Sequence, residues 1–241
     1  MYSKLNTSKI VITGITGGIA RATAVLARQQ GAEIIVTARS QQKLDEALKD
    51  LGTNVTGYVL DVSKADDVKQ FFDDVGPFDH LVTPAASSMF APISDLDLET
   101  ARELVDSKQW GQLYCVKYAI PYLDKSGSIT LFSGTVTQKA LPGATMFAAA
   151  GAATEASARI WALELAPVRV NTIVPGIIET PVWTNLMGDD GAKEQLQHFA
   201  DTLPVGRIGA PDDIAKSVLY LMDNGFVSGT SLVVDGGHRL I

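Results

Sequence analysis

A glycine-rich turn near the start of the sequence is the first feature whose residues could do chemistry. It reads Thr13-Gly14-Ile15-Thr16-Gly17-Gly18-Ile19-Ala20 and lies between a β-branched run and a helix-like stretch. Glycine lets the backbone turn sharply and approach a pyrophosphate, whose negative charge the start of the helix stabilises. Glycine also simply ends strands, so the position between a strand and a helix is what favours binding. The turn predicts a dinucleotide site formed by Gly14, Thr16, Gly17, Gly18 and Ile19.

The next expected strand ends in Ala38-Arg39-Ser40, with no carboxylate at its tip. In dinucleotide-binding domains an acidic residue at this tip selects the free ribose hydroxyl of NAD(H), whereas an arginine accommodates the 2′-phosphate of NADP(H). Arg39 and Ser40 therefore favour NADP(H) as the cofactor. The alternative interpretation is an ordinary surface arginine that precedes a helix.

The elements that position these residues alternate along the whole chain. Expected strands are Lys9–Gly14, Glu33–Ala38, Asn54–Leu60, Asp79–Thr83, Ser128–Phe132, Val168–Val174 and Ser231–Val234. Expected helices are Gly18–Gln30, Gln41–Leu51, Asp66–Asp74, about Leu98–Leu123, Thr145–Leu165 and Asp212–Met222. Apolar strands separated by helices indicate a parallel sheet that is covered on both faces. We expect a single α/β domain over residues 1–241, with a doubly wound, Rossmann-type parallel sheet and ligands beyond the carboxyl ends of its strands.

Composition excludes several classes of function. The 241 residues carry 20 Lys+Arg and 27 Asp+Glu, a net charge of −7, which argues against nucleic-acid and anionic membrane partners because both are polyanions. The single cysteine, Cys115, excludes an intramolecular disulfide and a thiolate-rich metal site. His80, His198 and His238 are scattered without the spacing of metal ligands, so no metal is expected. The sequence has no apolar N-terminal segment or membrane-length run, which predicts a cytoplasmic protein.

Several motifs, in the right order, resemble those of the short-chain dehydrogenase/reductase family. The glycine-rich turn resembles the family's TGxxxGxG turn, with Ala20 in place of the last glycine. Further matches are Asp61-Val62, Arg169-Val170-Asn171, Pro175-Gly176-Ile177-Ile178-Glu179-Thr180, Gly206-Arg207-Ile208-Gly209, Pro211-Asp212-Asp213 and Gly229 with Val234-Asp235-Gly236-Gly237. The resemblance covers essentially the whole chain and implies an oxidoreductase that uses a nicotinamide cofactor.

The resemblance also implies which residues hold the cofactor. Asp61 and Val62 correspond to the family's adenine pocket, and Ala85 and Ala86 belong to Thr83-Pro84-Ala85-Ala86, an altered form of its Asn-Asn-Ala-Gly turn. At the other end, the nicotinamide and its carboxamide correspond to Pro175, Gly176, Ile178 and Thr180.

The catalytic half of the sequence departs from the family pattern. In the family, a tyrosine supplies a proton, a lysine one helical turn later lowers its pKa, a serine holds the carbonyl oxygen, and an asparagine completes the proton relay. The corresponding places here hold Phe147, Gly151, Gly134 and Lys108, and no Tyr-x-x-x-Lys occurs elsewhere in the chain. The family's usual ketone or alcohol chemistry therefore cannot run on its usual residues.

Two functions of different classes remain open. The first is an NADP(H)-dependent oxidoreductase that transfers hydride by a non-standard mechanism, for example to an imine or another activated acceptor. The second is a catalytically silent NADP(H)-binding protein that serves as a sensor or scaffold. A third function, cofactor-free lyase or dehalogenase chemistry, is weaker because relatives of that type still need a serine and a tyrosine.

Lys108 and Ser133 are the candidate catalytic residues. Lys108 could orient a substrate carboxylate, or donate a proton if burial lowers its pKa, or its ammonium could reach solvent or pair with Asp106 or Glu155. Ser133 could donate a hydrogen bond to substrate or satisfy local backbone. Glu155, four residues beyond Gly151, is expected to pair with a neighbour across a subunit interface.

The segment at about 181–204 corresponds to the family's variable substrate lid. Its Trp183, Leu186, Met187 and Phe199 indicate a hydrophobic small-molecule substrate, or equally a segment that packs onto the core, and His198 could face the substrate. The small side chains of the alanine-rich helix Phe147–Leu165 would let another helix approach closely. The resemblance implies a homodimer or homotetramer.

Overall fold

Seven parallel strands form one sheet in a computed structural model that describes residues 5–87 and 89–241. The side chain of Leu186 also lies outside the described part. The strands are β1 (Lys9–Ile12), β2 (Glu33–Ala38), β3 (Val55–Val59), β4 (Phe78–Val82), β5 (Leu123–Phe132), β6 (Arg169–Pro175) and β7 (Ser231–Val234), in the order β3-β2-β1-β4-β5-β6-β7. The expected doubly wound, Rossmann-type α/β fold is confirmed.

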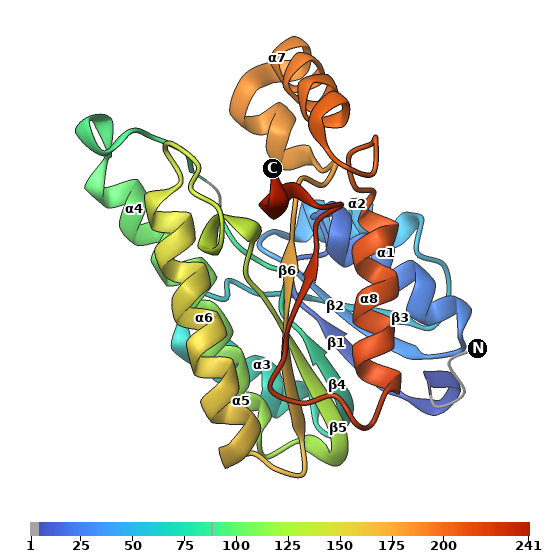
Figure 1. The fold of residues 1–241 in the computed structure, drawn as a ribbon. Helices are drawn as coiled ribbons and strands as arrows, with labels where there is room; N and C mark the ends of the chain where they lie inside the picture. Colours follow the sequence, from blue (N-terminus) through green and yellow to red (C-terminus); the bar gives the residue numbers. More distant parts are fainter. Residues whose placement is uncertain (1–4, 88) are drawn as a thin grey trace.

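Helices cover both faces of this sheet (Figure 1). The principal helices are α1 (Gly18–Gln29), α2 (Gln41–Lys49), α3 (Ala65–Val75), α4 (Leu98–Val105), α5 (Gly111–Ala119), α6 (Thr145–Glu164), α7 (Pro181–Thr202) and α8 (Pro211–Asp223). One core layer lies between the sheet and α1, α2 and α8, and the other lies between the sheet and α3, α5 and α6. Consecutive strand residues such as Ile10, Val11 and Ile12 are therefore fully buried, each against one layer or the other.

The expected long helix at Leu98–Leu123 is interrupted in the structure. A π-helical turn, η3 (Asp106–Trp110), separates α4 from α5, and α5 ends at Ala119. A turn of this kind inserts an extra residue into the helical ladder and re-aims the side chains around it. Here it carries Lys108, whose side chain is buried. Hydrophobic periodicity cannot reveal such a turn because the apolar spacing continues through it.

Strand β5 also begins earlier than Ser128, where the apolar run predicted its start. Its pairing with β4 moves from Phe78–Leu123 to His80–Ser128, so residues 124–127 bulge out of the ladder. The bulge is held locally, since the backbone N–H and hydroxyl of Ser126 donate to Asp124 Oδ1 over 2.8 and 2.6 Å. Regular pairing therefore starts where the sequence predicted it.

The Arg169-Val170-Asn171 motif anchors the sheet edge. Arg169 is buried, and its guanidinium donates to the carbonyls of Leu221, Met222 and Asn224 at the end of α8, over 2.5 to 3.1 Å. Asn171 binds the chain that leads to β7, donating to Val227 O over 2.9 Å and accepting from the Thr230 N–H over 3.1 Å. The guanidinium satisfies helix-end carbonyls that would otherwise lack donors.

Among the described residues, the structure contains no helix whose length and hydropathy would let it cross a membrane.

Candidate functional site

The carboxyl ends of β1 and β4 meet at the glycine-rich turn. Gly14 follows β1 with a φ of +72°, a left-handed conformation that glycine adopts without strain. A Cβ at Gly14 would lie 2.8 Å from Ala85 Cβ, so the turn after β4 packs directly on this glycine. The Ala85 N–H also donates to Thr13 Oγ1 over 3.4 Å. The structure thus brings together two segments that are about seventy residues apart in the sequence.

The start of α1 meets the segment that follows β6. A Cβ at Gly18 would lie 3.2 Å from Pro211 Cγ and 3.3 Å from Thr180 Cγ2, so no larger residue fits without displacing them. Gly17 is the N-cap of α1 and has no side chain with which to cap the first-turn amides, which leaves these donors to an anion. Thr16 and Gly17 are exposed beside them. The exposed, uncapped amides of this cradle fit a pyrophosphate.

The carboxyl ends of β2 and β3 lie side by side, at the same end of the sheet as the glycine-rich turn. Leu60 N–H donates to Ala38 O over 2.8 Å, which joins the chain that leads to Asp61 to the chain that leads to Arg39. Arg39 is exposed, and Ser40 caps α2 by accepting from the Lys43 N–H over 3.4 Å. Asp61 Oδ1 accepts from the Ser63 hydroxyl over 2.7 Å, a contact that fixes its carboxylate. Val62 is buried against Gly111, where an added Cβ would lie 2.9 Å from Val62 Cγ2.

The chain that leaves β6 forms a strap at the opposite end of the cradle. Gly176 N–H donates to Val234 O over 3.0 Å, and a Cβ at Gly176 would lie 2.7 Å from Asp235 Cα. Ile178 pairs with Gly209 in an isolated bridge and accepts the Trp183 indole N–H over 2.9 Å. These contacts therefore fix the backbone of the strap, which includes Pro175, Ile178 and Thr180, beside Gly18. Ala86, by contrast, is exposed in the loop after β4.

Gly134 and Phe147 face each other beyond the end of β5. A Cβ at Gly134 would lie 3.7 Å from Phe147 Cε1, so a side chain at position 134 would point at the ring. The Phe147 ring stacks on Phe90, with centroids 5.9 Å apart and an interplanar angle of 19°. This side of the site is therefore an aromatic surface. Phe90 gave no signal in the sequence because it lies in an irregular loop.

Lys108 is buried against the Phe147 ring. The side chain does not reach solvent, contrary to one sequence interpretation, because the π-helical turn directs it inward and leaves the residue 3% exposed. Lys108 Nζ lies 4.3 Å from the Phe147 ring centroid and donates to Ser133 O over 3.4 Å. In residues 5–87 and 89–241, neither Asp106 nor Glu155 comes within ion-pair distance of it. Burial lowers the pKa of Lys108 to about 8, while the charge of Glu155 acts in the opposite direction.

Glu155 turns inward rather than toward a neighbouring subunit. Its Oε1 accepts the Ser133 hydroxyl over 2.5 Å and the Thr137 hydroxyl over 2.7 Å. Ser133 therefore satisfies a buried carboxylate and not local backbone, and its proton is already committed. A Cβ at Gly151 would lie 2.8 Å from Ser133 Oγ and 3.0 Å from Thr137 Cγ2. Glycine at position 151 is thus what gives the two hydroxyls room to reach Glu155.

The segment that contains α7 lies over this end of the sheet. Gly188 has a φ of +71° and breaks α7 into two helices. Phe199 packs between Trp183 and His238, and His238 Nδ1 lies 3.1 Å from Thr135 Oγ1 in the loop after Gly134. His198 and Met187 are exposed, and the side chain of Leu186 lies outside the described part.

Buried His80 plays no part in this site, because it lies within the sheet and pairs with Ser128 over 2.9 Å. Within the described ranges, His, Cys, Asp and Glu side chains form no group of three that could hold a metal ion.

Comparison with known proteins places this geometry in a family. A family model described as enoyl-(acyl carrier protein) reductase matches residues 14–239. The 3-oxoacyl-(acyl-carrier-protein) reductase of Thermotoga maritima is 32% identical over 240 residues, which cover 94% of this chain and 96% of the relative. The chain belongs to the short-chain dehydrogenase/reductase family.

Other members of the family also match this chain over nearly its whole length. Dehydrogenase/reductase SDR family member 4 of Homo sapiens is 32% identical over 241 residues, covering 94% of this chain and 86% of the relative. A crystal structure of a small-chain dehydrogenase in complex with NADPH is 32% identical with a TM-score of 0.83, covering 98% of this chain and all of that one. A putative betaketoacyl-ACP reductase has a TM-score of 0.86 at 30% identity, covering 99% and 100% of the two chains.

Proposed function

We propose that this member of the short-chain dehydrogenase/reductase family binds NADP(H) and reduces a small molecule without the family's tyrosine–lysine relay. The glycine cradle at Gly14 and Gly18 holds the pyrophosphate, and Arg39 with Ser40 receives the 2′-phosphate. Asp61, Val62, Ala85 and Ala86 line the adenosine end, and Pro175, Gly176, Ile178 and Thr180 hold the nicotinamide end. Bound NADPH supplies a hydride, and the residues beyond β5 decide which acceptor can take it.

The observation that carries the non-standard mechanism is the set of contacts around Phe147. Phe147 has no transferable proton, Gly134 offers no hydroxyl, and the Ser133 hydroxyl already donates to Glu155 over 2.5 Å. Lys108 is the remaining nitrogen acid beside the ring, with Nζ 4.3 Å from the ring centroid. A buried ammonium stabilises negative charge that develops on an acceptor, and a pKa of about 8 lets it give up a proton near neutral pH. Since the same ammonium disfavours a preformed cation, a neutral imine or an enone suits the site better than an iminium ion.

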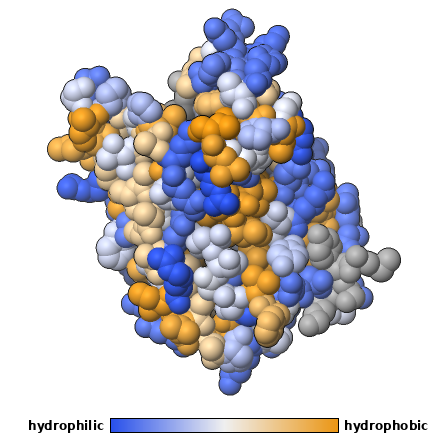
Figure 2. All heavy atoms as spheres, in the orientation of Figure 1, coloured by the Kyte–Doolittle hydropathy of each residue, from blue (hydrophilic) through white to orange (hydrophobic). Residues whose placement is uncertain are grey.

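The substrate enters beneath the lid segment at about 181–204, which Gly188 divides. Trp183 and Phe199 pack toward the strap and His238, and the apolar rings on this side of the lid favour a hydrophobic substrate. We place the protein in the cytoplasm as a homodimer or homotetramer. Exposed apolar residues on α6, Ile160 and Leu163, support an interface there, and Figure 2 shows apolar atoms along that side of the molecule.

The second candidate function is a catalytically silent NADP(H)-binding sensor or scaffold. The stacking of Phe147 on Phe90 favours it, because this contact closes an aromatic surface where the family keeps its proton donor. Both functions require the cofactor, and they differ only in turnover.

Two measurements test these functions in sequence. We expect NADPH to raise the melting temperature more than NADH does, and calorimetry should give a dissociation constant in the micromolar range. NADPH oxidation is then followed with ketones, enones and cyclic imines as acceptors. Oxidation with enones or neutral imines but not with simple ketones supports the reductase, and binding without oxidation by any acceptor supports the sensor. Absence of NADPH binding contradicts both.

A further inference from the structure

The ammonium of Lys108 is a buried charge without a close counterion. Its nitrogen contacts one backbone carbonyl at 3.4 Å and one aromatic face at 4.3 Å. The ion pairs of the described residues do not include it. A charge that is removed from water and not neutralised at short range acts strongly on other charges nearby, because the surrounding effective dielectric constant is low.

The groups that face Lys108 leave its positive charge only partly offset. The π-helical turn packs against α4, α5 and α6. Among the titratable groups on these helices, Glu155 of α6 is the one whose charge acts on the pKa of Lys108, and it raises that pKa. Arg102 and Glu103 of α4 and Lys117 of α5 are exposed, and the loop 133–137 contains no ionisable side chain. The carboxylate of Glu155 is itself held by two hydroxyls, which spread its charge.

We propose that Lys108 makes the site distinguish the two oxidation states of the nicotinamide ring, favouring the neutral, reduced ring of NADPH over the positively charged ring of NADP⁺. This inference rests on the proposed function, since it requires NADP(H) to bind with its ring beside Phe147. Both forms of the cofactor carry the same phosphates, whose contributions cancel in the ratio of the two dissociation constants. The difference that remains is the ring charge, which the ammonium of Lys108 repels.

The direction of the pH dependence follows from the state of the lysine. Burial lowers the pKa of Lys108 to about 8, so the side chain is charged at neutral pH and neutral well above it. Repulsion of NADP⁺ is therefore present below this pH and lost above it. Binding of NADP⁺ near this pH should also expel a proton from Lys108, because the two positive charges oppose each other.

The test compares the affinities of NADPH and NADP⁺ for the intact protein by calorimetry. In the wild type, the ratio of the NADP⁺ to the NADPH dissociation constant should fall on the order of tenfold between about pH 7 and about pH 9.5. Lys108→Met, nearly isosteric and apolar, should give the lower ratio at both pH values. Lys117→Met is the matched control, because Lys117 lies over the Tyr118 ring on the adjoining helix but is exposed and screened. It should behave as the wild type.

A second variant tests the charge rather than the lysine itself. Glu155→Gln removes the negative charge that raises the pKa of Lys108, so the fall of the ratio with rising pH should occur at a lower pH than in the wild type. Calorimetry in buffers of different ionisation enthalpy should detect proton release on NADP⁺ binding in the wild type but not in Lys108→Met. Equal ratios in the wild type and Lys108→Met, at both pH values, would overturn the inference while leaving the proposed function intact. A wild type that binds neither nucleotide would overturn the proposed function itself.

Discussion

Gly134 and Gly151 differ in what an added side chain would meet. Around Gly134 the nearest atoms to a new Cβ are 3.7 and 3.8 Å away, an ordinary contact distance. At Gly151 the nearest is Ser133 Oγ at 2.8 Å, and that oxygen is hydrogen-bonded to Glu155. A serine at position 134 would therefore meet its neighbours at ordinary contact distances, whereas a lysine at position 151 would have to displace a buried hydrogen-bond network.

Substitutions at these two glycines should therefore have unequal costs for stability. Gly134→Ser with Phe147→Tyr should melt within a degree or two of the wild type, while Gly151→Lys should lose about 1–3 kcal/mol of unfolding free energy. Adding Ser133→Ala to Gly151→Lys should recover part of the loss, because the closest contact disappears. Urea denaturation measures each difference. Equal stability of Gly151→Lys and the wild type would mean that the hydroxyl network does not need the glycine.

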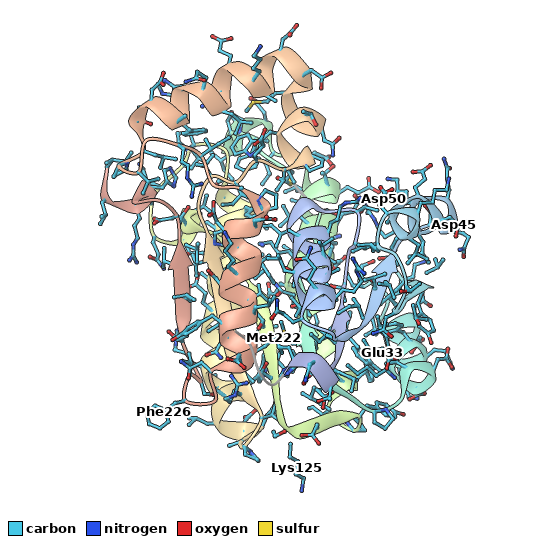
Figure 3. All side chains as sticks on the ribbon, turned by 90° about the vertical axis from the view of Figure 1, so that its right-hand side faces the viewer. Glu33, Asp45, Asp50, Lys125, Met222 and Phe226 are labelled. Carbon is cyan, nitrogen blue, oxygen red and sulfur yellow. The ribbon has the colours of Figure 1, made fainter. Side chains whose placement is uncertain are left out.

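Arg39 should decide between the two nicotinamide dinucleotides. Arg39→Asp replaces a positive charge with a negative one at the tip of β2, which repels a 2′-phosphate but can accept a hydrogen bond from a free ribose hydroxyl. The expected result is a loss of NADPH affinity of tenfold or more with little change for NADH, as measured by melting shifts and calorimetry. Lys125→Asp makes the same change of charge at the opposite end of the sheet (Figure 3) and should leave both affinities unchanged. An unaltered NADPH shift in Arg39→Asp would remove Arg39 from the phosphate site.

At the scale of elements, the strand pair β4–β5 holds a histidine that must stay neutral. His80 is buried and pairs with Ser128 across the two strands, and burial lowers its pKa to about 4. An unfolded chain takes up a proton at this position near the ordinary value, whereas the folded chain does not. The contribution of neutral His80 to the free energy of unfolding is thus fully present above the ordinary pKa of histidine, and it is lost as the pH falls toward 4.

His80 should account for a defined part of the loss of unfolding free energy at acid pH. Between about pH 7.5 and about pH 5, its protonation in the unfolded chain should remove about 2 kcal/mol of unfolding free energy. His80→Asn should lose correspondingly less over the same interval, although it starts from a lower stability. His198→Asn, at an exposed position, is the control and should follow the wild type. Urea titrations of the three proteins at the two pH values supply the three differences, and parallel losses in wild type and His80→Asn would contradict the assignment.

The elements that build the glycine cradle were predictable from the sequence, and the contacts around Phe147 and Glu155 were not. β-Branched runs and the glycine turn reflect local requirements of the backbone, so the succession of strands along the chain and the positions of Gly14, Gly18 and Arg39 follow from them. The inward direction of the Lys108 side chain depends on a π-helical turn. The hydrogen bonds of Ser133 and Thr137 to Glu155 depend on the space that Gly151 leaves. Both are properties of packing between distant segments, which the pattern of one segment does not contain. The glutamate one turn after Gly151 was the available signal.

On the scale of the whole molecule, the surface of α6 carries apolar residues that the monomer leaves uncovered. Ala152, Ala156, Ile160 and Leu163 follow one another at helical spacing, and all four are exposed, Leu163 to 82%. Small residues in the first half of this stripe would let a second helix approach closely. Phe226 is fully exposed at another place, beyond the end of α8 and at the end of the sheet away from α7 (Figure 3).

These two surfaces separate a dimer from a tetramer. Ala156→Arg places a long, charged side chain in the middle of the α6 stripe, where the exposed position tolerates it in the monomer but not in a close helix pair. If α6 forms a two-fold interface, light scattering should show the mass of this variant falling to half that of the wild type. Phe226→Ser should leave the mass of a dimer unchanged and should halve that of a tetramer whose second interface includes Phe226. A wild-type mass that persists in Ala156→Arg would place the contact elsewhere, since an arginine at that position cannot be accommodated between two closely packed helices.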